Sequence, residues 1–400
     1  MKDMKEAVIV SAARTPIGRA ARGTLRYTRP DDLAAMAIKV AIERATGLNA
    51  EQIEDIVLGC AMPEQEQGMN IARMAALRAG IPPSVPAFTL NRLCASGLEA
   101  IAVGAMRIMT GQAEVVVAGG VESMSLVPFD KSPIKPNPAL MHEYPDAYLS
   151  MGLTAENLVE RWNISREEAD IFAFESHRKA LAAIDAGKLK EEIVPVPVKF
   201  QEMTPDGKIV TKEVLFDTDE GPRRDTSLEA LAALKPAFRQ NGTITAGNSS
   251  QRSDGAAAVV LMSATKADEL CLPLLGRFVD YTVTGVPPEI MGIGPAYAIP
   301  KLLQRVSEQR GKSMSVEDIE VIELNEAFAA QALAVMKEYP LPRERVNPNG
   351  GAVALGHPLG CTGARQTVTL LHELRRRGGG VGMVTMCVGG GMGAAGLFEV

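Results

Sequence analysis

The chain contains few aromatic residues, few histidines and few cysteines, and it has no long apolar run. Of its 400 residues, 4% are aromatic, four are histidine and five are cysteine. An odd number of cysteines without a C-x-x-C spacing favours a reducing compartment, which we take to be the cytoplasm, over a disulfide framework. The cysteines also lack the spacing of metal ligands, so we expect no metal site. No apolar run approaches the roughly 20 residues of a membrane-spanning helix.

The charge balance excludes further classes of partner. The formal net charge is -6, with 42 basic against 48 acidic residues. A mildly acidic body attracts neither nucleic acid nor an anionic membrane surface, so we expect neither as a partner. With 46% hydrophobic and 22% charged residues, the chain has the composition of an ordinary globular protein. Its length suffices for two or three domains.

Strands alternate with helices along the first 123 residues. Short apolar runs bounded by turn residues predict strands, and apolar residues at helical spacing predict amphipathic helices. The predicted strands are 8–10, 56–58, 88–90 and 114–117, the last ending in Gly119-Gly120, and the predicted helices are 31–44, 70–79 and a third after Cys94. This alternation is typical of an α/β protein whose sheet is covered on both faces.

A proline-rich segment interrupts this pattern. Pro128, Pro133, Pro136 and Pro138 continue neither a helix nor a central strand. We therefore assign residues 124–254 to an inserted loop domain, between a first half (1–123 plus 255–275) and a second half (276–400). Inside the insertion we expect helices over 154–162 and 166–186, the second opened by a capping box, with loop or edge strand over 201–225. A buried strand follows over 256–262.

The second half repeats the plan of the first. A shift of 266 residues (319 − 53) places Ile53-Glu54 on Ile319-Glu320 and the strand at 115–118 on 381–384 without a gap. A shared register over this distance predicts two duplicated βαβ-type halves. If the halves pack face to face, equivalent helix starts converge and bring Cys94 near His357 and Cys387.

Cys94 is the first candidate for chemistry. It directly precedes a segment with apolar residues at helical spacing, so its thiol is expected at the mouth of a helix. Unpaired N–H groups and the positive end of the helix dipole would lower the thiol pKa from about 8.5 toward neutrality. The alternative is a small buried core residue. Cys60 and Cys271 are interpreted as packing residues, and Cys361, beside His357, is ambiguous.

His357 and Cys387 lie in two glycine-rich segments of the second half. His357 is flanked by glycines that let the backbone approach a ligand, and its neutral imidazole could accept the Cys94 proton. Cys387 follows a buried strand; it is either a core residue or an acid/base thiol. The run after it matches G-x-G-x-x-G, but only four residues remain, so no dinucleotide-binding helix can follow. Its backbone N–H groups, for example that of Gly389, could instead face an oxyanion.

Asn325 opens a segment that we expect to be helical, after a strand at 320–323. As an N-cap it would have a structural role only. Alternatively, its amide could hold a water molecule or a carbonyl oxygen.

These segments, in their order along the chain, resemble those of the thiolases. The similarity lies in NRLCASG around Cys94, NEAFA at 325–329, GHPLGCTGAR at 356–365 and CVGGGMG at 387–393. It continues in MGLTAEN at 151–157, ITAGNSSQRSDGAA at 244–257 and MGIGPA at 291–296. The resemblance implies a five-layered α-β-α-β-α fold, an inserted loop domain over the active site, and a homodimer or homotetramer. It implies coenzyme A and acyl-CoA as substrates, without a permanently bound cofactor.

The resemblance also implies a role for each matching residue. Cys94 would be the acylated nucleophile, His357 its base, and Cys387 the thiol that exchanges a proton with the acetyl-CoA α-carbon. Asn325, through a water, and His357 would form one oxyanion hole, and the backbone N–H groups of Cys94 and Gly389 the other. The residues implied in CoA and substrate binding are Arg223, Ser250, Phe328 and Met151. Arg223 could equally be a solvated loop charge.

The resemblance predicts reversible thiolytic cleavage of 3-ketoacyl-CoA in fatty acid β-oxidation. Ser150, where short-chain biosynthetic relatives commonly carry histidine, favours this reading over an acetyl-CoA C-acetyltransferase, which is the alternative. A decarboxylating ketoacyl synthase is disfavoured because Asn325 stands where its second histidine would be. A non-catalytic acyl-CoA-binding or lipid-binding relative is disfavoured because Cys94, His357 and Cys387 are all present.

Overall fold

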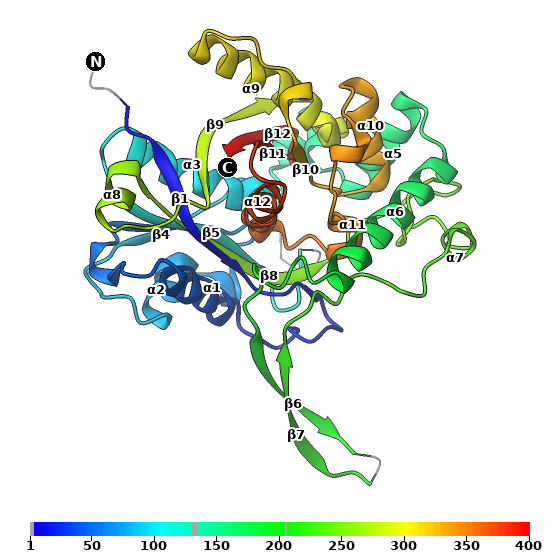
Figure 1. The fold of residues 1–400 in the computed structure, drawn as a ribbon. Coiled ribbons are helices and arrows are strands. Elements are labelled where there is room, and N and C mark those ends of the chain that lie inside the picture. Colours follow the sequence, from blue (N-terminus) through cyan, green and yellow to red (C-terminus); the bar gives the residue numbers. More distant parts are fainter. Residues whose placement is uncertain (1–3, 130–134, 205) are drawn as a thin grey trace.

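The computed structural model describes residues 4–129, 135–204 and 206–400 (Figure 1). Pro133 of the predicted insertion lies outside these residues. In the described chain, a mixed sheet runs in the order β10-β11-β12-β9-β1-β8-β5-β3-β4, with the short strand β2 (Gly18–Arg19) beside β8. None of the helices described is long and apolar enough to cross a bilayer.

The first half of the chain forms one end of this sheet. Its strands are β1 (Ala7–Arg14), β3 (Asp55–Gly59), β4 (Ala87–Leu90), β5 (Val115–Ser123) and β8 (Ser253–Ser263). Its helices are α1 (Pro30–Arg44), α2 (Ile71–Arg78), α3 (Ser96–Met109) and α8 (Ala264–Glu269). The predicted strands and helices are confirmed, except that β5 does not end at Gly119-Gly120 but continues to Ser123. Gly119 is needed inside the strand, because a Cβ there would lie 2.1 Å from the carbonyl oxygen of Ala257 on β8.

The second half repeats this arrangement. Its strands are β9 (Gly276–Gly285), β10 (Val321–Leu324), β11 (Val381–Val388) and β12 (Met392–Glu399), and its helices are α9 (Gly294–Arg310), α10 (Ala329–Glu338), α11 (Ala352–Leu355) and α12 (Leu359–Arg376). The parallel pair Ile56–Val117 of β3 and β5 corresponds to the parallel pair Ile322–Met383 of β10 and β11, again at a shift of 266 residues (322 − 56). The predicted duplication therefore extends to the strand register.

The two halves are stacked in five layers. Helices α3 and α12 pack against each other between the two parts of the sheet. Helices α1 and α2 cover the outer face of the first half, and α9 and α10 cover that of the second, as Figure 1 shows. The halves are not separate sheets, because Val8 and Ile9 of β1 pair with Arg277 and Gly276 of β9. This short contact satisfies backbone groups at two strand edges.

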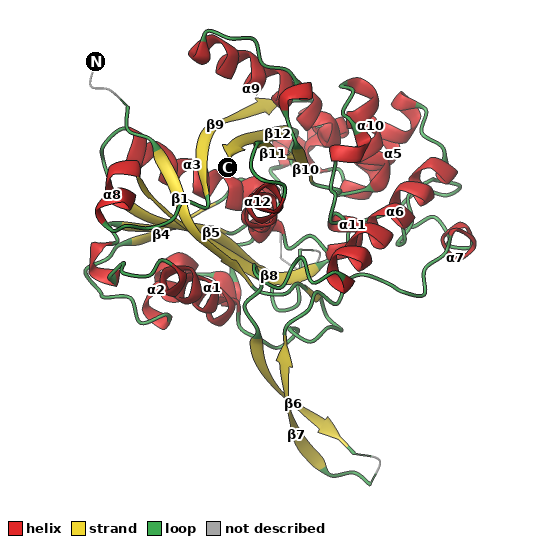
Figure 2. Ribbon diagram, viewed as in Figure 1, coloured by secondary structure: helices red, strands yellow, loops and turns green. Residues whose placement is uncertain are grey.

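The segment 124–254 supplies the remaining elements. These are α4 (Pro138–Glu143), α5 (Met151–Trp162), α6 (Arg166–Asp185), β6 (Val196–Met203), β7 (Ile209–Phe216) and α7 (Leu228–Ala232). The predicted capping box opens α6, with Ser165 accepting from the Glu168 N–H and the Glu168 carboxylate accepting from the Ser165 N–H. Strands β6 and β7 form a two-stranded hairpin that projects away from the body (Figure 2).

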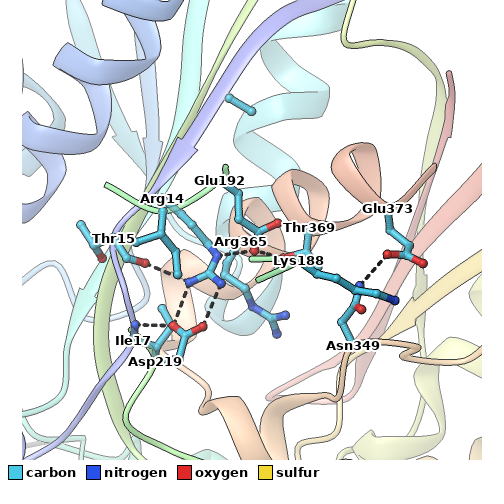
Figure 3. Close-up of polar contacts among 12 residues, drawn as sticks. Arg14, Thr15, Ile17, Lys188, Glu192, Asp219, Asn349, Arg365, Thr369 and Glu373 are labelled. Carbon is cyan, nitrogen blue, oxygen red and sulfur yellow. Dashed lines mark hydrogen bonds and ion pairs between the residues drawn. The ribbon is translucent and has the colours of Figure 1, made fainter. Parts of the chain in front are cut away.

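A buried ion-pair network ties this segment to both halves. The guanidinium of Arg14 on β1 donates to both carboxylate oxygens of Asp219 at 2.8 Å and to Glu192 at 2.7 Å (Figure 3). Asp219 also accepts from the N–H of Ile17, and Glu192 accepts from the hydroxyl of Thr369 on α12. All these side chains have little or no exposed surface. Charges buried this deeply are stable only when paired, so the network fixes Glu192 and Asp219 against β1 and α12.

Candidate active site

Cys94 lies in a tight turn at the start of a central helix, as predicted. The turn Leu93–Ala95 is a single 3₁₀ turn that leads directly into α3. Leu93 has φ +44, a left-handed conformation that is costly for a branched side chain. Its backbone N–H donates to the side-chain oxygen of Asn91 at 2.7 Å, which helps to hold the turn. The strained residue therefore directly precedes the candidate nucleophile.

The predicted near-neutral pKa of the Cys94 thiol is wrong. Only 9% of the residue is exposed, and this burial raises the pKa of the thiol to about 11. Hydrogen bonds from the backbone N–H groups of Gly389 and of Cys94 itself favour the thiolate, but they do not offset the burial, and the charge of Glu122 opposes them. The resting nucleophile is therefore a neutral thiol.

A second thiol lies beside the first. Cys387 is on β11, which packs against the turn that carries Cys94. Burial raises the pKa of Cys387 well above its ordinary value, and ionisation of Cys94 raises it further. Gly389 follows directly after β11, and a Cβ placed on it would lie 2.9 Å from Leu93. The two thiols and the Gly389 N–H therefore surround one small space.

His357 is a neutral, oriented imidazole. Burial, assisted by the nearby charge of Arg365, lowers the pKa of His357 to about 3. The hydroxyl of Thr362 donates to the carbonyl oxygen of Pro358 at 2.9 Å, and it lies 2.6 Å from His357 Nδ1. The hydroxyl oxygen is thus an acceptor for Nδ1–H, which leaves a lone pair on Nε2. Nε2 is the atom that can take a proton.

Asn325 contacts that same nitrogen. Its side-chain Nδ2 lies 3.3 Å from His357 Nε2, and both residues are buried. Within the described parts of the chain, the amide oxygen of Asn325 has no hydrogen-bond partner, so it is available to a donor such as water.

The prediction that Asn325 opens a helix is wrong. Helix α10 begins at Ala329, and residues 325–328 form a loop whose last residue, Phe328, is extended. Phe328 pairs with Ser249 in an isolated bridge, and the Ala329 N–H donates to the carbonyl oxygen of Asn248. These contacts with residues 248–250 hold the loop in place of a helical turn.

The Cys94–Cys387 pair and the His357–Asn325 pair lie at the same end of the molecule. Asn325 follows β10 directly, and its N–H donates to Thr385 on the neighbouring strand β11, two residues before Cys387. His357 precedes α12, whose first turns pack against the turn that carries Cys94. No hydrogen bond joins Cys94 to His357 among the residues described here.

Of the four residues implied in substrate binding, three lie near the candidate site and one lies apart from the other three. Met151 begins α5 beside Gly389, where its sulfur would lie 3.8 Å from an added Cβ. The buried ring of Phe328 packs edge-on against the ring of Phe238, with the ring centroids 6.1 Å apart. The Ser250 N–H donates to the carbonyl oxygen of Ala327, the residue before Phe328. Arg223 stands apart from them. Its side chain is 56% exposed and pairs with Asp225.

Sequence reasoning missed some residues of the site and misplaced one cysteine. Thr362, which sets the tautomer of His357, lies five positions after it, and Leu93 gives no sequence signal for its left-handed conformation. His177 is buried and accepts from the Arg223 N–H at 3.1 Å. Cys60 and Cys361 are buried, whereas Cys271 is exposed and is not a packing residue. Burial raises the pKa of Cys361 to about 12.

The arrangement is suited to covalent transfer chemistry at a thiol. It offers a neutral nucleophile, backbone N–H groups beside its sulfur, a second thiol, and an imidazole whose free nitrogen adjoins an amide. Backbone N–H groups in a dry site stabilise an oxyanion strongly. A thiol and a neutral imidazole together support nucleophilic acyl transfer.

Comparisons with known proteins agree with this chemistry. The chain is 52% identical over 397 residues to a 3-ketoacyl-CoA thiolase of Bacillus subtilis, covering 99% of this chain and 100% of that protein. It matches the crystal structure of the Bacillus anthracis acetyl-CoA acetyltransferase at 45% identity with a TM-score of 0.89, covering both chains completely. It also matches the dimeric peroxisomal thiolase of Saccharomyces cerevisiae at 41% identity and a TM-score of 0.87, covering 99% of this chain and 97% of that one.

Family models extend the agreement over almost the whole chain. The thiolase N-terminal domain matches residues 7–265, and the thiolase C-terminal domain matches residues 272–400. The chain belongs to the thiolase family of CoA-dependent acyltransferases.

Proposed function

We propose that this protein catalyses the reversible CoA-dependent cleavage of a 3-ketoacyl-CoA into acetyl-CoA and an acyl-CoA shortened by two carbons. The observation that carries the proposal is the convergence of Cys94, Cys387 and the His357–Asn325 pair at one end of the central layer. Each half of the chain supplies part of this site.

In the first step, the sulfur of Cys94 attacks the 3-keto carbon while His357 Nε2 takes the thiol proton. The keto oxygen becomes an oxyanion within reach of hydrogen-bond donors. The bond between C2 and C3 then breaks, and its electron pair forms the enolate of acetyl-CoA. Cys387 donates its proton to that carbon and becomes a thiolate. Both thiols have raised pKa values, which keeps them protonated until substrate arrives.

In the second step, the Cys387 thiolate takes the proton of the CoA thiol, and the CoA thiolate attacks the thioester on Cys94. The tetrahedral oxyanion collapses, the carbon–sulfur bond to Cys94 breaks, the Cys94 sulfur regains its proton from His357, and acyl-CoA leaves. In this proposal, the N–H groups of Cys94 and Gly389 bind one of the two oxyanions, and His357 with Asn325 binds the other. Imidazole protonated at Nε2 is a donor, so His357 acts first as a base and then as an oxyanion partner.

Residues 124–254 form the CoA-binding insertion in this proposal. Met151, Ser250 and Phe328 line the approach to Cys94, and the exposed guanidinium of Arg223 binds a phosphate group of CoA. The insertion is fixed to the body by the Arg14 network, so these groups have a rigid support.

The physiological direction and assembly are also proposals. Ser150, the N-cap of α5, favours a degradative thiolase of fatty acid β-oxidation. Acetyl-CoA C-acetyltransfer is the second candidate, because a relative of that name matches the chain end to end. We propose a cytoplasmic homodimer or homotetramer. Edge strand β4 and the exposed apolar side chains along the projecting hairpin, Met203, Ile209 and Leu215, are surfaces that a second copy would cover.

The test is cleavage of acetoacetyl-CoA, followed by the absorbance of its enolate, with and without CoA. Loss of absorbance that requires CoA and disappears in Cys94→Ala supports the proposal. Tight binding of acyl-CoA without turnover would instead identify a non-catalytic relative. Values of kcat/KM for substrates from four to sixteen carbons, measured in both directions, decide between the two candidate activities.

A further inference from the structure

Glu122 is a buried carboxylate that binds segments from both halves of the chain. It lies at the end of β5 and has no exposed surface. One oxygen accepts from the N–H groups of Ala61 and Gly360, both at 2.8 Å. The other accepts from the Met62 N–H at 3.3 Å and from the Gln67 side-chain amide at 2.6 Å. Four N–H donors on one buried carboxylate fully use its acceptor capacity.

One of these contacts leads to the nucleophile. Ala61, whose N–H binds Glu122, accepts through its carbonyl oxygen from the side-chain amide of Asn91 at 3.0 Å. The amide oxygen of Asn91 in turn accepts from the Leu93 N–H at 2.7 Å. Leu93 is the left-handed residue that precedes Cys94. A continuous chain of hydrogen bonds therefore joins Glu122 to the strained turn.

The other contact leads to the base. Gly360 lies in the first turn of α12, three residues after His357. It sits directly on the first half, because an added Cβ would lie 2.7 Å from the Cα of Cys60 and 2.8 Å from the Ala61 nitrogen. Glu122 binds the Gly360 N–H at this contact, near the positive end of the α12 dipole.

We propose that Glu122 is a positioning residue for acyl transfer, which sets the Cys94 turn and the His357 loop at a fixed separation. This inference rests on the proposed function. The two segments come from different halves, and in the part of the chain that the structure describes no hydrogen bond between Cys94 and His357 joins them, so another group must fix their geometry. The carboxylate does so through one oxygen, which accepts from Ala61 on one side of the junction and from Gly360 on the other. A misplacement of the reacting groups by about 1 Å can reduce turnover by about 100-fold.

The key variant is Glu122→Gln, which keeps the size of the side chain but has only one oxygen. Two of the four N–H groups lose their acceptor, and the charge is removed. The matched control is Glu373→Gln, at the far end of α12, where a buried carboxylate accepts from Asn349, Arg376 and Arg377. The measurements are kcat, KM for CoA, and the alkylation rate of Cys94 by iodoacetamide between pH 6 and pH 10. The wild type must first show CoA-dependent cleavage, because its absence refutes the proposed function and not this inference.

We expect Glu122→Gln to reduce kcat at least tenfold while KM for CoA changes less than twofold. Alkylation of Cys94 at pH 8 is expected to become faster, because the negative charge that disfavours the thiolate is gone. Slower turnover with faster alkylation distinguishes lost positioning from general damage. The inference is overturned if kcat falls no more than in Glu373→Gln, or if alkylation and turnover slow together.

A second variant keeps the test decisive if Glu122→Gln does not fold. Asn91 is exposed, so Asn91→Ala is expected to fold, and it breaks only the link between Ala61 and Leu93. It should reduce kcat at least fivefold without changing KM for CoA. When both variants fold, the double variant should be no slower than Glu122→Gln alone, because both act on one chain of contacts. The inference is refuted if Asn91→Ala leaves kcat unchanged. It is also refuted if the loss of kcat in the double variant equals the product of the losses in the two single variants.

Discussion

The ionisation state of the Cys94 thiol is directly measurable through its reactivity. Its pKa of about 11 places the thiol three units above pH 8. At that pH only about one molecule in a thousand carries the thiolate, which corresponds to a cost of about 4 kcal/mol. Since the pKa of His357 is about 3, a proton transfer between the two free side chains is uphill by about 11 kcal/mol at 1.36 kcal/mol per unit. A thiolate–imidazolium pair therefore does not exist before substrate binds.

The assay is alkylation of Cys94 by iodoacetamide across a pH range, followed by mass spectrometry of the cysteine-bearing peptide. We expect the rate constant to rise about tenfold for each pH unit from 7 to 10, because the thiolate fraction does so below the pKa. No inflection is expected between pH 5 and 8, since His357 stays neutral there. Cys94→Ala supplies the background from the other cysteines. A rate that levels off below pH 8 would show a preformed thiolate and refute the reasoning.

Three further variants test other parts of the site and fold. Cys387→Ala should still acquire an acyl group on Cys94 from acyl-CoA, seen as a mass increase, but should not exchange the α-proton of acetyl-CoA in deuterated buffer; normal exchange would contradict its role. Asn325→Ala should lower kcat by about 10²–10³, as loss of one oxyanion donor does, and a change confined to KM would argue against it. Arg14→Met should lower the free energy of unfolding by about 3–5 kcal/mol, because it leaves buried carboxylates without a cation; an unchanged urea midpoint would show that the network contributes no stability.

Much of the fold was predictable because the chain carries the same plan twice. The 266-residue shift aligned strands by their apolar pattern, and the structure gives β3–β5 and β10–β11 the same pairing. The helix after Cys94 was predictable from its apolar spacing. The start of α10 was not, because Asn325 is a good N-cap in isolation and residues 248–250, distant in the sequence, hold the end of its segment outside the helix.

The electrostatics of the site could not be predicted from the sequence. A helix mouth favours a thiolate, but the burial of Cys94 has the larger effect, and burial is a property of the packed layers. The partners of Glu122 come from three places in the chain, residues 61–62, Gln67 and Gly360, and no spacing reveals them. In contrast, the identities of Cys94, His357 and Cys387 as candidates required only their local glycine-rich or helical setting.

The duplication also bears on why only one of the two equivalent helix starts carries the proposed nucleophile. The position equivalent to Cys94 in the second half is Gly360, and there the backbone of residues 60 and 61 leaves no room for even a methyl group. A thiol at that position is sterically forbidden while the halves remain in contact. The close packing of α12 against residues 60 and 61 brings His357 toward the first half. The same contact keeps a thiol out of the equivalent position of the second half, so the two halves contribute different groups to the proposed site.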